Sequence, residues 1–272
     1  MNHYKKLRLF TIIATLASLL LLGGCTDDKT KTQPLKVGVI AGPESQIMQV
    51  ALEQAKKMFG LNSELIQFND YITPNIALFD KSIDVNAYQH QPYLNDVNNS
   101  RHYNLVAVGK TFLYPLGAYS KKIKHIEQLS DHAKIAIPND PSNESRALHL
   151  LQKGGLITLK DPNNITATPE DIADNPKKLV FVTLDAAQLP RSLDDVELAV
   201  INSTYSVAAG YLPDKDALLL ESSQSPYVNL IVARKNNADD PRIKQLVEAY
   251  HSQPVLDKAR ELFKGAAIPG WK

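Results

Sequence analysis

From Leu35 onward, short apolar runs alternate with longer amphipathic stretches, and this alternation constrains the fold more than any other feature of the chain. The first apolar run, Val37–Ile40, predicts a buried strand. It is followed by Pro43–Phe59, whose apolar residues recur at helical spacing, and by Gly60, which is suited to end a helix. Strand-like and helix-like segments keep alternating to the end of the chain. The pattern therefore predicts an α/β protein.

The order of these segments indicates two α/β lobes. The chain is expected to leave its first lobe near Pro115 and to return to it at a strong strand, Val228–Ala233. We therefore predict lobe I from residues 35–115 and 227–272, and lobe II from residues 116–226. Two crossings between lobes leave a cleft, and clefts of this kind are favoured ligand sites.

The start of the chain is typical of an export signal. Three cations precede a mainly apolar run of fourteen residues, which is shorter than the ~20 residues that a membrane-spanning helix needs. These residues are Lys5, Lys6 and Arg8, followed by Leu9–Leu22. We expect residues 1–24 to be a signal peptide and the mature chain to carry no spanning helix.

The single cysteine, Cys25, lies directly after Leu22-Gly23-Gly24. An exported chain with one cysteine has no disulfide framework, so the thiol needs another explanation. Its position resembles a bacterial lipobox, in which the cysteine sulfur is acylated. We therefore predict that residues 25–34 form a lipidated tether that anchors the protein to a bilayer without spanning it. Ordinary secretory cleavage is the alternative.

The composition and motifs exclude several classes of function. With 30 basic and 29 acidic residues, the chain has no strong field for nucleic acid. The sequence contains no nucleophile elbow, zinc-protease helix, phosphate-binding loop or dinucleotide fingerprint. His125 and His132 have poor spacing for a zinc site. We expect no metal, no cofactor and no catalysis; an enzyme acting on an amino acid or peptide is a further hypothesis, against which the missing nucleophile argues.

The segment from Asn139 to Arg146 is the most informative one after the leader. Asp140 can cap a helix whose first residue is Pro141, and Asn143 and Arg146 then lie on one face of its first turn. An arginine fork at that position can grip a carboxylate through two parallel hydrogen bonds. The competing interpretation is a capped surface helix whose Arg146 pairs with Glu144 or with solvent.

A second cluster lies at the end of the expected strand Ile83–His90. On a regular strand, Asn86, Tyr88 and His90 share one face. Flat aromatic faces suit a hydrophobic or thioether side chain. The expected pocket wall contains Tyr71, Tyr88, His90 and Tyr93. Alternatively, these aromatic residues belong to the core.

Distinctive blocks of sequence, in the same order from Lys36 to Trp271, resemble the NlpA family of lipoproteins, the methionine-binding components of bacterial ABC importers. The blocks are Phe68-Asn69-Asp70-Tyr71, Tyr88-Gln89-His90-Gln91-Pro92-Tyr93-Leu94, Pro138-Asn139-Asp140-Pro141-Ser142-Asn143, Gln188-Leu189-Pro190-Arg191-Ser192-Leu193-Asp194-Asp195, Ala199-Val200-Ile201-Asn202 and Ser225-Pro226-Tyr227-Val228-Asn229-Leu230-Ile231-Val232.

The resemblance implies a type II periplasmic-binding-protein fold that closes over L-methionine, or D-methionine, and delivers it to an ABC permease and its ATPase in the inner membrane. It implies that Arg146 holds the ligand carboxylate. Asn202 and Asn229 would bond the amino and carboxylate ends, with help from Asn143. The aromatic residues named above would surround the ligand side chain.

The chain departs from the family pattern in two places. The pair Glu144-Ser145 stands where the family has a variable residue and then glycine, and Tyr88 stands where phenylalanine is common. An alternative is therefore a surface or outer-membrane lipoprotein of the same fold, with a methionine analogue or small peptide as ligand, or with a role in envelope or host contacts. Thr26, directly after the cysteine, is compatible with sorting to the outer membrane or cell surface.

Overall fold

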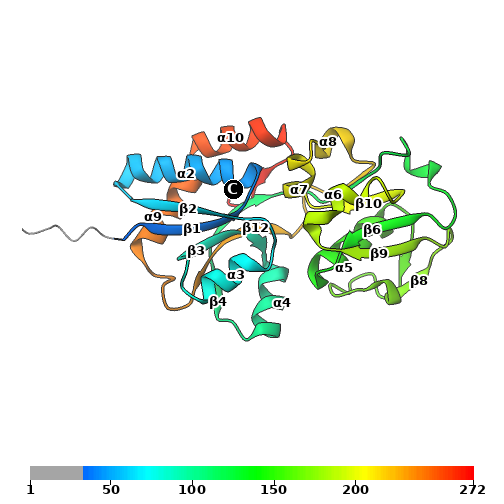
Figure 1. Ribbon diagram of the computed structural model, residues 1–272, viewed down its shortest axis with the longest axis horizontal. Helices are drawn as coiled ribbons and strands as arrows, with labels where there is room; N and C mark the ends of the chain where they lie inside the picture. Colours follow the sequence, from blue (N-terminus) through cyan, green and yellow to red (C-terminus); the bar gives the residue numbers. More distant parts are fainter. Residues whose placement is uncertain (1–32) are drawn as a thin grey trace, which may run out of the picture. The chain divides into compact units, whose positions relative to one another are not determined.

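The computed structural model describes residues 33–272, so the predicted signal peptide, Cys25 and most of the predicted tether lie outside the described residues. Residues 34–272 form one compact unit. This unit contains two large sheets, each covered by helices, which confirms the expected α/β fold with two lobes (Figure 1).

The sheet of lobe I has six strands in the order β13-β4-β12-β3-β1-β2. Strand β1 pairs in parallel with β2 and β3, whereas β12 pairs antiparallel with β3 and β4. The bounds are β1 (Leu35–Ile40), β2 (Ser63–Phe68), β3 (Val85–His90), β4 (Leu105–Leu113), β12 (Val228–Arg234) and β13 (Ile268–Pro269). Strands that are far apart in the sequence therefore form the centre of this sheet.

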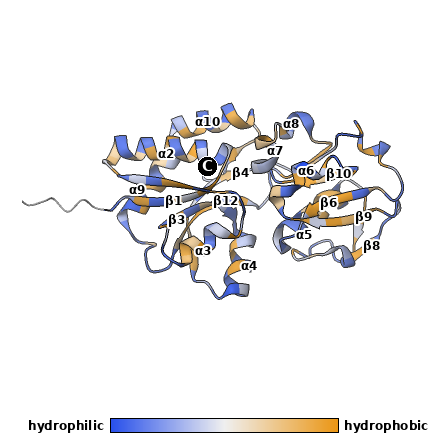
Figure 2. Cartoon of the chain, viewed as in Figure 1, coloured by the Kyte–Doolittle hydropathy of each residue, from blue (hydrophilic) through white to orange (hydrophobic). Residues whose placement is uncertain are grey.

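Helices cover both faces of this sheet, with α2 and α10 along one face and α3 and α4 on the other (Figure 1). Helix α2 begins with Pro43 and ends at Gly60, which has a positive φ of 69°. Both α9 and α10 pack on α2 and share its apolar core. Blue and orange alternate along α2 and α10 in Figure 2, as expected of amphipathic helices. The bounds are α2 (Pro43–Phe59), α3 (Thr73–Phe79), α4 (Gln91–Arg101), α9 (Pro241–Tyr250) and α10 (Gln253–Phe263).

The structure corrects the predicted alternation along β3. The register between β3 and β12 passes from Ala87 directly to Gln89, so the ladder has a bulge at Tyr88. Asn86 consequently bonds to Gln89 and Asn75, while Tyr88 and His90 line a pocket. The prediction that Asn86 shares their face is therefore wrong, because a bulge shifts the side-chain alternation by one residue.

Helix α4 is a second difference, because no helix is predicted directly after His90. Pro92 lies in its first turn, and His90 caps it by accepting a hydrogen bond from the backbone N–H of Tyr93. The helix is strongly polar, with only three buried residues, which explains why an apolar pattern does not reveal it.

The sheet of lobe II has five strands in the order β11-β5-β10-β6-β9. Its core lies between this sheet and α5. The strands are β5 (Gly117–Tyr119), β6 (Lys134–Pro138), β9 (Val180–Leu184), β10 (Leu198–Ile201) and β11 (Leu219–Leu220), with a separate pair β7 (Thr158–Leu159) and β8 (Ile172–Asp174). The helices are α5 (Pro141–Lys153), α6 (Leu189–Ser192), α7 (Ser203–Ala208) and α8 (Pro213–Asp216).

The chain passes from one sheet to the other twice, between β4 and β5 and between β11 and β12. The two crossings are hydrogen-bonded to each other, because the backbone N–H of Glu221 donates to the carbonyl of Leu116 across 2.9 Å. The side chain of Glu221 in turn accepts from the backbone N–H of Leu116 across 3.0 Å. The lobe boundaries given above, 35–115, 116–226 and 227–272, stay a prediction.

Candidate functional site

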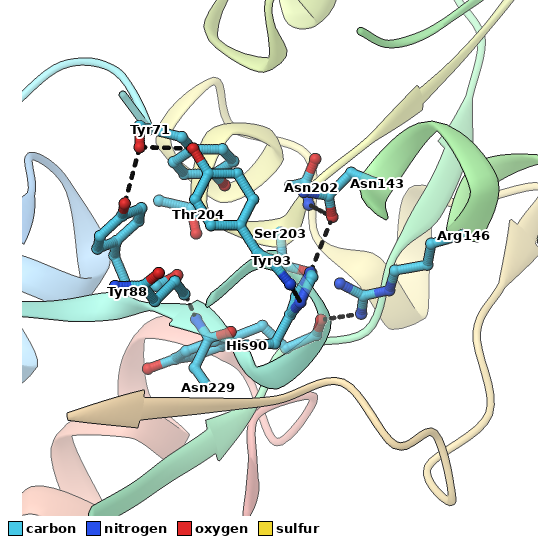
Figure 3. Close-up of a pocket in the computed structure, with 12 residues that line it drawn as sticks. Tyr71, Tyr88, His90, Tyr93, Asn143, Arg146, Asn202, Ser203, Thr204 and Asn229 are labelled. Carbon is cyan, nitrogen blue, oxygen red and sulfur yellow. Dashed lines mark hydrogen bonds between the residues drawn. The ribbon is translucent and has the colours of Figure 1, made fainter. Parts of the chain in front are cut away.

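A pocket lies where residues of both lobes meet, and all eight of the predicted ligand-binding residues line it (Figure 3). They are Tyr71, Tyr88, His90, Tyr93, Asn143, Arg146, Asn202 and Asn229. Gln89, Tyr114, Ser203 and Thr204 complete the lining. The structure therefore brings the predicted residues together, while their roles toward a ligand stay predictions.

The first turn of α5 fixes the polar end of the pocket. Asp140 caps the helix by accepting from the backbone N–H of Asn143 at 3.0 Å, as predicted. The side-chain amide of Asn143 also donates to both oxygens of Asp140. Its nitrogen is therefore committed, and the carbonyl oxygen Oδ1 points toward the other groups of the pocket.

His90 is neutral and has a defined tautomer. Its Nδ1 accepts the backbone N–H of Tyr93, so the ring proton is on Nε2, which donates to Oδ1 of Asn143 across 3.2 Å. Burial, with the charge of Arg146 as a second cause, lowers the pKa of His90 from 6.5 to about 3. His90 therefore presents a hydrogen-bond donor to this site and no charge.

The side chain of Asn202 has one hydrogen-bond acceptor without a partner in the described residues. Its Nδ2 donates to Oδ1 of Asn143 across 2.9 Å, but its own Oδ1 is buried and has no partner among residues 33–272. An unpartnered buried acceptor is costly unless a ligand donor completes it. This atom is suited to accept a hydrogen bond from an ammonium group.

Arg146 is buried, with 4 % of its surface exposed, and its guanidinium points toward the centre of the pocket in Figure 3. Its Nε donates to Oε1 of Glu221 across 2.9 Å, and Nη2 donates to Oε2 of Glu221 and to the carbonyl of Tyr114. The competing interpretation, in which Arg146 pairs with Glu144 or solvent, is wrong. The two-pronged edge of the guanidinium binds Glu221, which leaves Nη1 for a ligand.

Glu221 and Tyr227, which both lie at the second crossing, hold this guanidinium in place. Burial opposes ionisation of Glu221, but the adjacent Arg146 outweighs it and keeps the pKa of Glu221 below its ordinary value. The ring of Tyr227 packs against Arg146, with 4.5 Å from the guanidinium carbon to the ring centre. His90 meets the same ring edge-on at 5.0 Å. Arg146 and His90 therefore pack on the same ring at the polar end of the pocket.

Aromatic rings form the opposite wall of the pocket. The ring centres of Tyr71, Tyr88 and Tyr93 lie 5.7–6.2 Å apart, and Tyr205 packs against Tyr71 at 5.1 Å. The hydroxyls of Tyr88 and Tyr93 both donate to the carbonyl of Tyr71 across 2.7 Å. Because these hydroxyls are satisfied by the protein, the wall offers mainly ring surface to a ligand.

The two residues that depart from the family pattern on α5 lie outside the pocket lining. The hydroxyl of Ser145 donates to the carbonyl of Asn164 and accepts from the backbone N–H of Ala167, so it fastens a loop of lobe II. Glu144 is half-buried; burial first, then the charge of Glu170, raises its pKa. Neither side chain narrows the pocket.

Sequence reasoning missed six residues of the site. Gln89, Tyr114, Ser203 and Thr204 line the pocket, and Glu221 and Tyr227 support Arg146. Ser203 and Thr204 follow Asn202 directly, and Tyr227 lies in one of the distinctive sequence blocks, so these positions carried a local signal. Glu221 carried none, because it meets Arg146 only through the fold.

Within residues 33–272 the structure contains no cluster of three or more side chains suited to hold a metal ion. None of the helices in the same range has the length and apolarity to cross a membrane.

Comparison with known proteins gives a consistent result. The family model described as NlpA lipoprotein matches residues 35–271. The D-methionine-binding lipoprotein MetQ of Salmonella typhi is 49 % identical over 268 residues, covering 98 % of this chain and 99 % of the relative.

Solved structures show the same similarity. An ABC transporter periplasmic substrate-binding protein from Coxiella burnetii has a TM-score of 0.84 and 54 % identity, covering 86 % of this chain and 99 % of its own. A nutrient-binding protein from Burkholderia cenocepacia, bound to methionine, has a TM-score of 0.85 and 49 % identity, covering 87 % of this chain and 100 % of its own. With its pocket between two α/β lobes and a family match over nearly all of the described residues, this chain belongs to the NlpA lipoprotein family.

Proposed function

We propose that this chain is the substrate-binding lipoprotein of an ABC importer, and that it binds methionine between its lobes and delivers it to the membrane permease. The similar proteins described above include one named for D-methionine binding and one bound to methionine. It is a binding protein in this proposal, and no residue of the pocket has a catalytic role.

The observation that carries the proposal is the pairing of a buried donor with a buried acceptor at one end of the pocket. Nη1 of Arg146 suits the carboxylate of an α-amino acid, and Oδ1 of Asn202 suits its ammonium group. Asn143 connects the two, because it lies three residues before Arg146 on α5 and bonds to Asn202. Asn229, on strand β12 of lobe I, adds a side-chain amide to the same pocket.

The aromatic wall supports methionine as the side-chain partner. A thioether sulfur interacts favourably with aromatic rings, and its flexible chain adapts to an irregular wall. Tyr71, Tyr88 and Tyr93 supply those rings, and the hydroxyls of Tyr88 and Tyr93 are already bonded to the carbonyl of Tyr71. A methionine analogue or a small methionine-containing peptide is the alternative ligand for the same wall.

Native mass spectrometry of the chain expressed from Thr26, purified without added ligand, tests the proposal. We expect an adduct with the mass of methionine that is lost on denaturation. A different mass would keep the transport class and change the cargo. A pocket that stays empty in the presence of added methionine would contradict the proposal and favour a role in envelope contacts.

We propose further that acylated Cys25 anchors the mature protein to the cell membrane, which keeps the folded part close to its permease. The ten residues 25–34 reach at most ~35 Å when extended, so the anchor limits the distance from the bilayer. Replacing Cys25 by Ser should move the protein from the membrane fraction to the soluble fraction. Unchanged membrane association in that variant would exclude lipidation at this residue.

A further inference from the structure

Glu44 is a buried carboxyl beside the pocket that the proposed binding mode does not use. It is the second residue of α2 in lobe I, and 5 % of its surface is exposed. The hydroxyl of Thr204, which lies on α7 in lobe II, donates to Oε1 of Glu44. The ion pairs found within residues 33–272 include none to Glu44. A carboxyl buried without a cation is costly, so its neighbours must compensate.

Asn229 is the second neighbour of this carboxyl. Its side-chain amide lies close enough to Glu44 to favour the charged form of that carboxyl and so to lower its pKa, and its Nδ2 donates to the carbonyl of Tyr88 across 2.9 Å. Because both partners are acceptors, the amide nitrogen must face them, which leaves Oδ1 of Asn229 for the pocket. Thr204 and Asn229 both line the pocket, whereas Glu44 does not, so Glu44 can affect a ligand through them.

We propose that Glu44 is a positioning residue of the binding site, whose carboxyl holds Thr204 and Asn229 in their pocket-lining orientations and so ties the two lobes together across the site. The proposal rests on the proposed function for its effect on methionine. It does not depend on that function for the contacts themselves, which can be tested without ligand.

The protonation of Glu44 gives this role a signature. Burial raises the pKa of Glu44 to about 7, against the opposing hydrogen bonds from Thr204 and Asn229. The titratable groups that interact with the charge of Glu44 are four tyrosines, Tyr71, Tyr114, Tyr205 and Tyr250. Burial raises the pKa of each tyrosine, so all four stay neutral between pH 6 and pH 8. His90, with a pKa of about 3, is also neutral there.

As the pH rises through 7, the charged form of Glu44 draws the two donors more strongly and attracts the ammonium group of a ligand. Methionine affinity should therefore increase with pH in this range. By linkage, a ligand that favours the charged form should also release protons from the protein when it binds near pH 7.

Calorimetry with methionine at pH 6 and pH 8, on the full chain purified in detergent, tests this. We expect the wild type to bind more tightly at pH 8 and to release protons at pH 7. Glu44→Gln should bind about tenfold more weakly at pH 8, with little pH dependence and no proton release. Glu53→Gln is the matched control, because Glu53 is exposed on the same helix. A Glu44→Gln variant with wild-type affinity and pH dependence overturns the proposal.

A double-mutant cycle on the melting temperature, with Glu44→Ala and Thr204→Val, tests the contact without ligand. We expect the two changes to be clearly non-additive, because each removes the same hydrogen bond. Additive effects overturn the proposal. A wild type that ignores methionine would refute the proposed function alone, and this cycle would still decide whether Glu44 and Thr204 are coupled.

Discussion

Arg146 divides its donors between the protein and the pocket, and this division determines how its mutants should behave. One edge of the guanidinium neutralises Glu221, whose side chain is only 13 % exposed. Removing Arg146 therefore does two things: it takes away a ligand contact, and it leaves a buried carboxylate without its cation.

Arg146→Ala should weaken methionine binding by roughly 100-fold or more and should lower the free energy of unfolding by roughly 3–5 kcal/mol. Calorimetry and urea denaturation measure the two effects. The double variant Arg146→Met/Glu221→Leu separates them, because it removes both charges together. It should recover most of the stability and none of the binding; recovery of binding would disprove the carboxylate role of Arg146.

Because the pKa of Glu44 is raised in the folded protein, the free energy of unfolding should depend on pH. The folded protein holds this proton up to a pH of about 7, whereas the unfolded chain releases it near 4.5. The folded state therefore binds more protons between these values, and stability falls as the pH rises through them. Relative to Glu44→Gln, the wild type should lose roughly 3 kcal/mol of unfolding free energy between pH 4 and pH 8. Urea denaturation at both pH values checks this; parallel curves would exclude a raised pKa.

At the scale of elements, the first turn of α5 combines a structural cap with part of the binding site. Asp140 accepts from the backbone N–H of Asn143 and also holds its side-chain amide. The bulge in β3 plays a similar part, because it turns Tyr88 and His90 toward the pocket while the side chains of Asn86 and Gln89 hydrogen-bond to each other. Local backbone geometry thus orients several pocket residues at once.

Asp140→Ala should cost ~1 kcal/mol of unfolding free energy, because α5 loses its N-cap. It should also weaken methionine binding, because Asn143 loses the partner that fixes its amide. Ser252→Ala is the matched control, since Ser252 stands at the N-cap of α10 but makes no side-chain capping bond there. The denaturation midpoints of the two variants are compared with that of the wild type. Equal losses of stability in both variants would mean that the side-chain cap from Asp140 does not stabilise α5.

At the scale of the whole molecule, the site exists only because two lobes meet. The contacts that cross between them include His90 to Asn143 and Tyr205 to the carbonyl of Asn69. An apolar cluster also joins Tyr88 and Tyr93 of lobe I to Tyr205 and its neighbours in lobe II. A ligand held between the lobes adds contacts to both and should stabilise the folded protein as a unit.

Methionine should therefore raise the melting temperature in a concentration-dependent way. At 100 times the dissociation constant, the stabilisation is about 2.7 kcal/mol, which corresponds to a shift of roughly 5–10 °C for a chain of this size. Differential scanning fluorimetry over a methionine series measures it, with leucine as the comparison ligand. An Arg146→Ala variant that shows the full shift would contradict the proposed site.

The sequence by itself determined the local elements and most of the chemistry. Periodicity and caps located α2 and α5, because those signals act within a few residues, and the family resemblance indicated eight of the twelve residues that line the pocket. Tertiary structure alone decided the rest. The bulge at Tyr88 depends on pairing with β12, and the partners Glu221 of Arg146 and Glu44 of Thr204 lie 75 and 160 residues away. Such contacts leave no periodic trace, since they arise only when the folded lobes bring distant residues together.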